Sequence, residues 1–179
     1  LMRNRNRYDF DDMINWVIKA FEEHPSLLMR YQEQFLYILV DEYQDTSGTQ
    51  NKIVELLINY WEQPNVFVVG DDDQSIYAFR GADVENMRLY EKQYHPLMVK
   101  LEQNYRSHGH ILDTANYLIS NNTDRLGKNL RTDAGHGEPV RIYDAPSDHA
   151  EAAWLVDEIK ALVNSGIKRT EIALLYRSN

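Results

Sequence analysis

The 179-residue sequence contains no cysteine, which excludes disulfide bonds and thiolate metal sites. It also has no apolar run near the ~20 residues that a membrane-spanning helix needs. The polar opening LMRNRNRYDF lacks the apolar segment of a signal peptide. From these absences we expect a soluble protein without a membrane association, and the missing cysteine is typical of a cytoplasmic one.

Positive charge is scarce as well, because the formal net charge is -9 at pH 7. This balance argues against a protein that binds nucleic acid mainly through a basic surface. It leaves open a single strand held by base stacking, since the chain carries 12 tyrosines, 5 phenylalanines and 3 tryptophans. Among the six scattered histidines, His108 and His110 come closest to a ligand pair, but no further ligand is near them in sequence, and we assign them no metal.

The remaining composition is that of a globular protein, with 43% hydrophobic and 26% charged residues, and the length allows one large or two small domains. Apolar residues recur at helical spacing in several segments. We expect the first helix at residues 11–24, with Asp11 or Asp12 as its cap, followed by a second short helix. Further helices are expected at 47–61, 84–94, 111–119 and 148–163.

Two apolar runs without alternation, at 36–40 and 66–70, indicate strands buried on both faces. The helix between them makes a unit of the length of a parallel crossover, so both strands end at one sheet edge, where α/β proteins place ligands. Further strands are expected at 98–102, 140–145 and 172–176, and a long loop at 120–138. The stretch around Pro96 is the expected domain boundary.

Two acids, Asp41 and Glu42, close the first strand. One carboxylate at such a position suits magnesium, which prefers hard oxygen ligands, and its neighbour can accept a proton from an attacking water. Many strands simply end in charged turns, so the pair alone does not establish a site. However, VDEYQDTSGTQ at 40–50 resembles the Walker B motif of superfamily 1 DNA helicases of the UvrD/PcrA/Rep type. This resemblance implies that Asp41 binds Mg²⁺ and that Glu42 is the catalytic base.

The segment VVGDDDQSIYAFRGAD at 68–83 resembles the third helicase motif of the same family. The resemblance implies that Gln74 senses the γ-phosphate of ATP, while Tyr77 and Phe79 stack on bases of single-stranded DNA and Arg80 supports this coupling. Each stacked base contributes ~1 to 3 kcal/mol without sequence preference. The alternative, a solvated acidic turn with both aromatics in the core, leaves the order of residues unexplained. Ala78 departs from the family, where a basic residue is common.

The segment LEQNYRS at 101–107 resembles the fourth motif, which opens the second motor domain of these helicases. Tyr105 would then stack on adenine. Arg106 would reach the γ-phosphate as an arginine finger, a task that suits its permanently charged, planar guanidinium. Because this arginine belongs to the second domain, closure of the two domains would depend on the nucleotide.

The resemblance spans nearly the whole chain and implies an α/β fold made of parts of two RecA-like motor domains, with parallel sheets flanked by helices. Residues 1–96 would be the C-terminal part of the first domain and residues 97–179 the N-terminal part of the second. The implied cofactors are ATP and Mg²⁺. The implied partners are single-stranded DNA and single-strand/duplex junctions, with protein partners left open. Three basic residues could meet DNA phosphates, although a solvated loop is the favoured interpretation: Arg125, Lys128 and Arg131.

The 179 residues contain no Gly-x₄-Gly-Lys-Ser/Thr loop, since Lys128 follows Gly127 but precedes Asn129. The first residue is not Met and the chain stops just after an expected core strand. We therefore expect a fragment that is inactive alone, from an ATP-dependent 3′ to 5′ DNA helicase and single-stranded DNA translocase of repair or replication. Two alternatives stay open. One is the helicase subunit of a RecB/AddA-type recombination nuclease, which a downstream nuclease domain would indicate. The other is a non-catalytic nucleic-acid-binding protein derived from a helicase, which an upstream P-loop would exclude.

Overall fold

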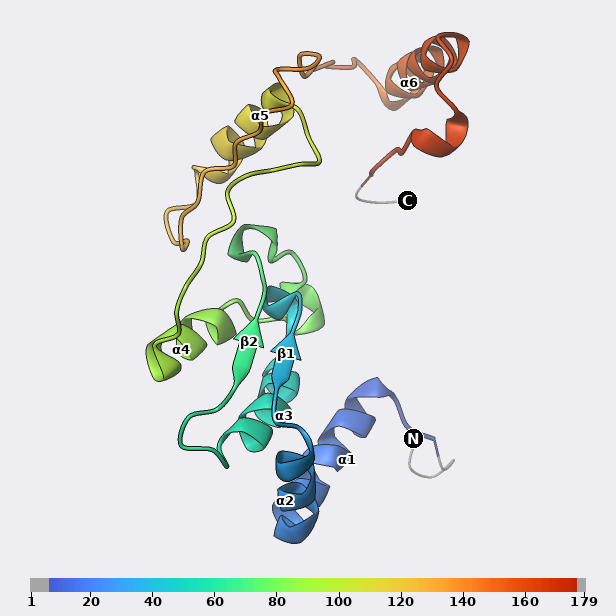
Figure 1. Cartoon of the computed structure of the whole chain (residues 1–179). Coiled ribbons are helices and arrows are strands. Elements are labelled where there is room, and N and C mark those ends of the chain that lie inside the picture. The colour runs from blue at the N-terminus through green and yellow to red at the C-terminus, as the bar shows by residue number, and fades with distance from the viewer. Residues whose placement is uncertain (1–6, 177–179) are drawn as a thin grey trace.

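The computed structural model describes residues 7–176, and the terminal residues 1–6 and 177–179 lie outside this description. In Figure 1 the first four helices and both strands lie at one end of the molecule, and the chain then runs to the last two helices at the other end. The elements are α1 (Phe10–Glu23), α2 (Pro25–Gln34), β1 (Ile38–Val40), α3 (Gly48–Ile58), β2 (Val66–Val68), α4 (Glu85–Tyr94), α5 (Gly109–Ile119) and α6 (Asp148–Asn164).

Local capping chemistry sets where the helices begin. The Asp9 carboxylate accepts the backbone N–H of Asp12 at 2.9 Å, and the Asp12 carboxylate accepts the N–H of Asp9 at 3.2 Å. The expected cap at Asp11 or Asp12 is therefore wrong, because the cap is Asp9 and Asp12 is its reciprocal partner. Helix α3 begins with the same kind of reciprocal pair, between Ser47 and Gln50.

Strands β1 and β2 pair in parallel, with Leu39 opposite Phe67, and α3 connects them. The expected parallel crossover is confirmed. The expectation that both strands are buried on both faces is wrong, since Leu39 is 73% and Phe67 is 62% exposed. Burial alternates along each strand because this two-stranded sheet has one covered face, toward which Ile38 and Val40 point.

Part of the buried core, including Tyr43, lies around the turn after β1. The apolar members of the core are Phe21, Tyr43, Ile58, Ala82, Tyr90 and Leu112. Burial raises the pKa of the Tyr43 hydroxyl to about 12, and this hydroxyl donates a hydrogen bond to Asn51 Oδ1. The buried amide of Asn86 donates to the backbone oxygen of Thr46 at 2.9 Å. These bonds fix α3 and α4 against the segment that follows β1.

The strands expected at 98–102, 140–145 and 172–176 are not formed. A strand requires a neighbour for its backbone N–H and C=O groups, and none of these segments lies in a ladder with another described segment. Their apolar side chains consequently face solvent, as with Leu101 at 79%, Ile142 at 94% and Leu175 at 92% exposure. A single bridge, between Gln103 and Arg131, lies just past the first of them.

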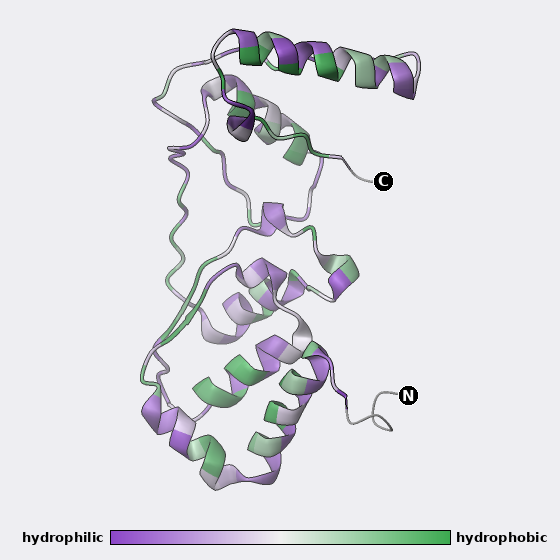
Figure 2. Ribbon diagram, turned by 90° about the vertical axis from the view of Figure 1, so that its right-hand side faces the viewer, coloured by the Kyte–Doolittle hydropathy of each residue, from purple (hydrophilic) through white to green (hydrophobic). Residues whose placement is uncertain are grey.

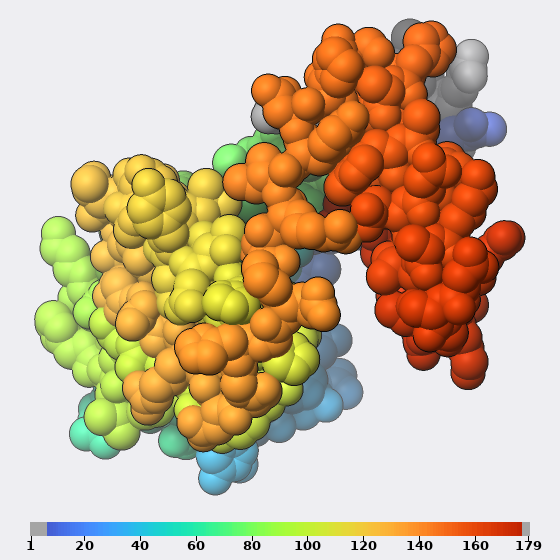
Figure 3. Space-filling view, turned by 90° about the horizontal axis from the view of Figure 1, so that it is seen from above, coloured from blue at the N-terminus to red at the C-terminus, as the bar shows by residue number. Residues whose placement is uncertain are grey.

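The segment expected as a long loop, 120–138, contains no helix or strand of its own. It is nevertheless tied to its surroundings, because Gly135 and His136 accept the N–H groups of Gly109 and His110 at 2.8 and 2.9 Å, at the start of α5. Helix α6 has no buried residue, and hydrophobic and hydrophilic positions alternate along it (Figure 2). Figure 3 shows this red segment beside the yellow and orange part that holds α5. Within residues 7–176, no helix is both long and apolar enough to cross a membrane.

Candidate functional site

The acid pair Asp41 and Glu42 follows β1 directly, and both side chains are exposed. The Glu42 backbone is left-handed, with φ 48° and ψ 44°, a conformation that is uncommon outside glycine. The Asp41 carboxylate accepts the N–H of Glu42 at 2.9 Å through Oδ1 and keeps Oδ2 for another partner. Such backbone conformations cost ~1 to 3 kcal/mol and concentrate at functional sites, so this turn is a candidate on geometry as well.

A chain of hydrogen bonds joins the turn after β1 to the loop after β2. The Gln44 amide donates to Glu42 Oε2 at 2.7 Å, and its oxygen accepts the N–H of Asp71 at 2.9 Å. The Asp71 carboxylate in turn accepts the Gln74 amide at 2.6 Å. The structure thus connects Glu42 with Gln74 through Gln44 and Asp71, at the carboxyl edge of the sheet where the sequence places the site.

The connecting residues have little freedom. Gln44 is 1% exposed, which is consistent with a structural rather than a solvated amide. A Cβ at Gly70 would lie 2.8 Å from Gln44 Oε1 and 3.2 Å from the Tyr43 nitrogen. Glycine is therefore needed at position 70, so that the two loops can approach each other.

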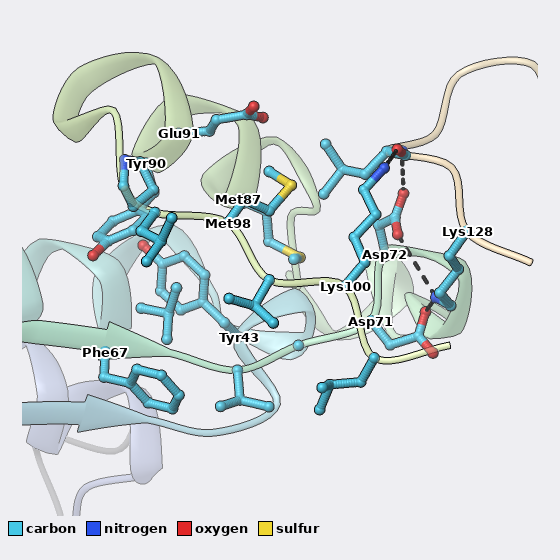
Figure 4. A pocket seen from close by; sticks show the side chains of 18 of the residues that line it. Tyr43, Phe67, Asp71, Asp72, Met87, Tyr90, Glu91, Met98, Lys100 and Lys128 are labelled. Carbon is cyan, nitrogen blue, oxygen red and sulfur yellow. Dashed lines mark hydrogen bonds and ion pairs between the residues drawn. The ribbon is translucent and has the colours of Figure 1, made fainter. Parts of the chain in front are cut away.

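The three acids after β2, Asp71 to Asp73, are covered by residues 124–128. Arg125 donates to both carboxylate oxygens of Asp73, at 2.8 and 2.5 Å. Lys128 forms an ion pair with Asp71 (Figure 4). It forms a second ion pair, at 3.2 Å, with Asp73. Because Arg125 and Lys128 are only 17% and 16% exposed in their side chains and pair with the acids, the solvated-loop interpretation is wrong for these two residues. Arg131, at 69%, is exposed.

Titration of Asp73 reflects this pairing. Burial acts to raise its pKa, but the hydrogen bonds and charges of Arg125 and Lys128 outweigh burial and lower the pKa below its ordinary value. The hydrogen bond to Asp73 likewise raises the pKa of Arg125. The contact therefore persists at neutral pH and is lost only when Asp73 is protonated, below its ordinary pKa near 3.8.

The aromatic pair of the same loop lies at the surface. Tyr77 and Phe79 are 38% and 78% exposed, and their ring centroids are 6.0 Å apart. The Arg80 guanidinium lies 5.3 and 5.5 Å from these two rings. A short 3₁₀ turn ending at Gly81, which has φ 86°, presents all three side chains together. The alternative in which these aromatics belong to the core is wrong, because both side chains are exposed.

The turn of the fourth motif is held by Asn104, whose side-chain oxygen accepts the N–H groups of Arg106 and Ser107 at 2.9 and 2.8 Å. Tyr105 is 90% exposed, and Arg106 is exposed as well. Within the described residues, the Arg106 guanidinium has no hydrogen bond or ion pair. The structure thus presents both side chains to solvent and brings neither into contact with Asp41, Glu42 or Gln74.

One histidine cluster emerges only in three dimensions. Ligand atoms of His110, Asp113 and His136 lie within 4.8 Å of one another. Histidines that bind metals normally have their second ring nitrogen held by a hydrogen bond, which fixes the ring. Neither imidazole has such a partner in residues 7–176, and we assign the cluster no metal.

The sequence missed the residues that connect the site. Gln44 and Asp71 lie inside the two motifs. The only sequence feature that could have indicated them is that each is a polar residue close to a residue with an expected role. Arg125 and Lys128 carried no signal for pairing with the acids, because 52 to 57 residues separate the partners.

Two parallel strands joined by a helix, with polar loops meeting at their carboxyl edge, define a mixed α/β protein of the RecA-like kind. Residues 1–95 match the family model of the UvrD/REP helicase N-terminal domain. Residues 99–179 match that of the UvrD-like helicase C-terminal domain. The chain therefore belongs to the UvrD/REP helicase family.

Individual relatives agree with this assignment. A DNA helicase II of Haemophilus influenzae is 47% identical over 171 residues, which are 96% of this chain and 23% of that protein. The ATP-dependent DNA helicases PcrA of Staphylococcus epidermidis and Staphylococcus aureus are 45% identical over 172 residues, again 96% of this chain and 23% of each relative. The chain thus spans about a quarter of the length of these relatives.

Proposed function

We propose that this chain is part of an ATP-dependent DNA helicase that moves 3′ to 5′ along single-stranded DNA and acts at single-strand/duplex junctions in repair or replication. The observation that carries the proposal is the hydrogen-bond chain from Glu42 through Gln44 and Asp71 to Gln74. It joins a candidate catalytic base to a candidate phosphate sensor. Family membership and the printed names of the relatives support the same conclusion.

In this proposal the first strand end performs the hydrolytic chemistry. Asp41 would hold Mg²⁺, because its exposed carboxylate offers a hard oxygen and magnesium keeps several waters besides one or two carboxylates. The charge of the bound ion would stabilise the negative charge of the phosphates. Glu42 would accept the proton of the attacking water through the oxygen that Gln44 does not occupy.

The remaining roles fall on the loops. Gln74 would contact the γ-phosphate with its amide, while Tyr77, Phe79 and Arg80 would hold single-stranded DNA by stacking. Residues 1–96 and 97–179 would belong to the first and second motor domains. From the second, Tyr105 would stack on adenine and Arg106 would reach the γ-phosphate, once closure brings the two parts together.

The test compares the full-length protein containing this chain with the isolated 179 residues. We expect the full-length protein to hydrolyse ATP with Mg²⁺ and to do so faster with single-stranded DNA. The isolated chain should show no DNA-stimulated turnover, because it contains no lysine-bearing phosphate loop. Phosphate release measured with and without an oligonucleotide decides this. A full-length protein without ATPase activity, or an isolated chain with robust activity, would refute the proposal.

Replacing the aromatic pair should weaken DNA binding without affecting nucleotide binding. In the full-length protein, Tyr77→Ala or Phe79→Ala is expected to lower affinity for single-stranded DNA by roughly 5- to 150-fold, the equivalent of ~1 to 3 kcal/mol for one stacked base. Fluorescence anisotropy with a labelled oligonucleotide measures the change. Phe79→Trp is the matched variant and should bind at least as tightly as the wild type. Unchanged affinity in both alanine variants would remove these rings from the DNA site.

A further inference from the structure

The segment from Asp124 to Lys128, here called the basic clasp, closes over the acids Asp71 to Asp73. Besides the ion pairs of Arg125 and Lys128, the backbone N–H of Leu126 donates to Asp72 at 2.6 Å. Each acid therefore has its own partner in the clasp. The acidic side chains are only 11 to 22% exposed, so solvent screens the contact weakly.

Charge explains why the clasp is needed. Three adjacent carboxylates on one tight loop repel one another. The positive charges of Arg125 and Lys128 reduce the net charge of this cluster from -3 to -1. Asp71 occupies the critical position. Its Oδ1 receives Lys128 and its Oδ2 receives the amide of Gln74. Without Lys128, an unpaired carboxylate would lie beside the amide that is proposed to meet an anionic phosphate.

The clasp also continues into the turn that carries Arg106. Past the clasp, the Asn129 N–H donates to the Glu102 carboxylate at 2.9 Å. The N–H of Arg131 donates to the Glu102 oxygen at 2.9 Å, and the Asn104 N–H donates to the Arg131 oxygen at 2.7 Å. Since Asn104 holds the backbone of Arg106, a short bonded route runs from Asp71 to the candidate arginine finger.

We propose that Lys128 and Arg125 are positioning residues that neutralise and orient the loop of Asp71 to Asp73. This orientation lets Gln74 meet the γ-phosphate and keeps the loop in a fixed position relative to the turn of Arg106. This inference rests on the proposed function. It adds Arg125 and Lys128 to the residues that support ATP hydrolysis. Asp71 becomes the residue whose carboxylate accepts both Lys128 and the Gln74 amide. The route between the two family segments is carried by defined ion pairs and backbone bonds.

The experiment uses the full-length protein and four variants: Lys128→Ala, Lys128→Arg, Asp71→Asn and the double variant Asp71→Asn/Lys128→Ala. Steady-state ATPase with saturating single-stranded DNA gives kcat and KM for ATP. We expect Lys128→Ala to lower kcat/KM by roughly 2- to 30-fold, the range of coupling changes caused by residues that do not touch ligand. DNA affinity without nucleotide should stay within about twofold. Lys160→Ala, on the surface of α6, is the matched control.

The double variant distinguishes positioning from mere structural support. Asp71→Asn removes the charge that Lys128 neutralises, and it should restore most of the activity that Lys128→Ala loses; Lys128→Arg should retain activity. An unchanged Lys128→Ala enzyme, or a double variant no better than the single one, overturns the inference. If Lys128→Ala does not fold, as judged by thermal unfolding, the inference still requires a folded and active double variant. Absence of ATPase in the wild type would instead count against the proposed function.

Discussion

Replacement of Glu42 by glutamine in the full-length protein is expected to lower kcat for ATP by roughly 10²- to 10⁴-fold, because a positioned general base contributes that much. Glutamine has the same shape, and its side-chain oxygen can still accept the bond from the Gln44 amide. The connection to Gln74 should therefore survive while the proton acceptor is lost. Phosphate release under saturating ATP and single-stranded DNA measures the effect.

Binding measurements separate this loss of chemistry from a loss of structure. The Glu42→Gln protein should bind single-stranded DNA and a nucleotide within about twofold of the wild type, because neither contact needs the carboxylate charge. Glu62→Gln, in the exposed segment after α3, changes the same chemical group away from the site and should leave kcat unchanged. Near-normal turnover in Glu42→Gln would remove Glu42 as the base.

Local sequence patterns predicted the part of the fold that depends on local interactions. The helical spacing of residues 47–61 predicted α3, and the two apolar runs on either side predicted the parallel pair. The start of α1 was placed within one residue, but its cap was misassigned by two or three positions, because the four residues from Asp9 to Asp12 include three acids that can cap. The reciprocal bond between Asp9 and Asp12 selects one of them.

The strands of the C-terminal part illustrate what a pattern cannot supply. An apolar run such as 172–176 has the composition of a strand, but a strand forms only where a neighbour pairs with its backbone. In the described residues that neighbour is missing, and Leu175 is 92% exposed. Composition therefore predicts the tendency of a segment, whereas pairing depends on residues far away in the sequence.

The same reasoning explains why some residues of the site were predicted from the sequence and others were not. Asp41, Glu42 and Gln74 could be chosen because each lies in a motif at a strand end, and the structure connects two of them. The clasp was assigned to solvent because an isolated arginine and lysine in a polar loop are usually solvated. Only the fold brings Arg125 within 2.8 Å of Asp73, across 52 residues.

Arg106→Ala in the full-length protein is expected to reduce DNA-stimulated kcat by roughly 10³- to 10⁵-fold, the effect of removing an arginine finger. The Asn104 side chain fixes the backbone of this residue, and its guanidinium is exposed without a partner in the described part of the chain. Because its backbone is fixed and its guanidinium is exposed, Arg106 can bind an anionic phosphate that domain closure brings close. Quenched-flow ATPase kinetics measure the loss.

Two further variants test the geometry behind this expectation. Arg106→Lys keeps the charge but loses the bidentate fork, so it should recover only a small part of the activity. Asn104→Ala keeps the arginine but removes both bonds that shape its turn, and we expect an intermediate loss with ATP affinity largely kept. Arg169→Ala, another exposed arginine, is the control. If Arg106→Ala turns over ATP like this control, the guanidinium does not reach the γ-phosphate, and closure must be driven by other contacts.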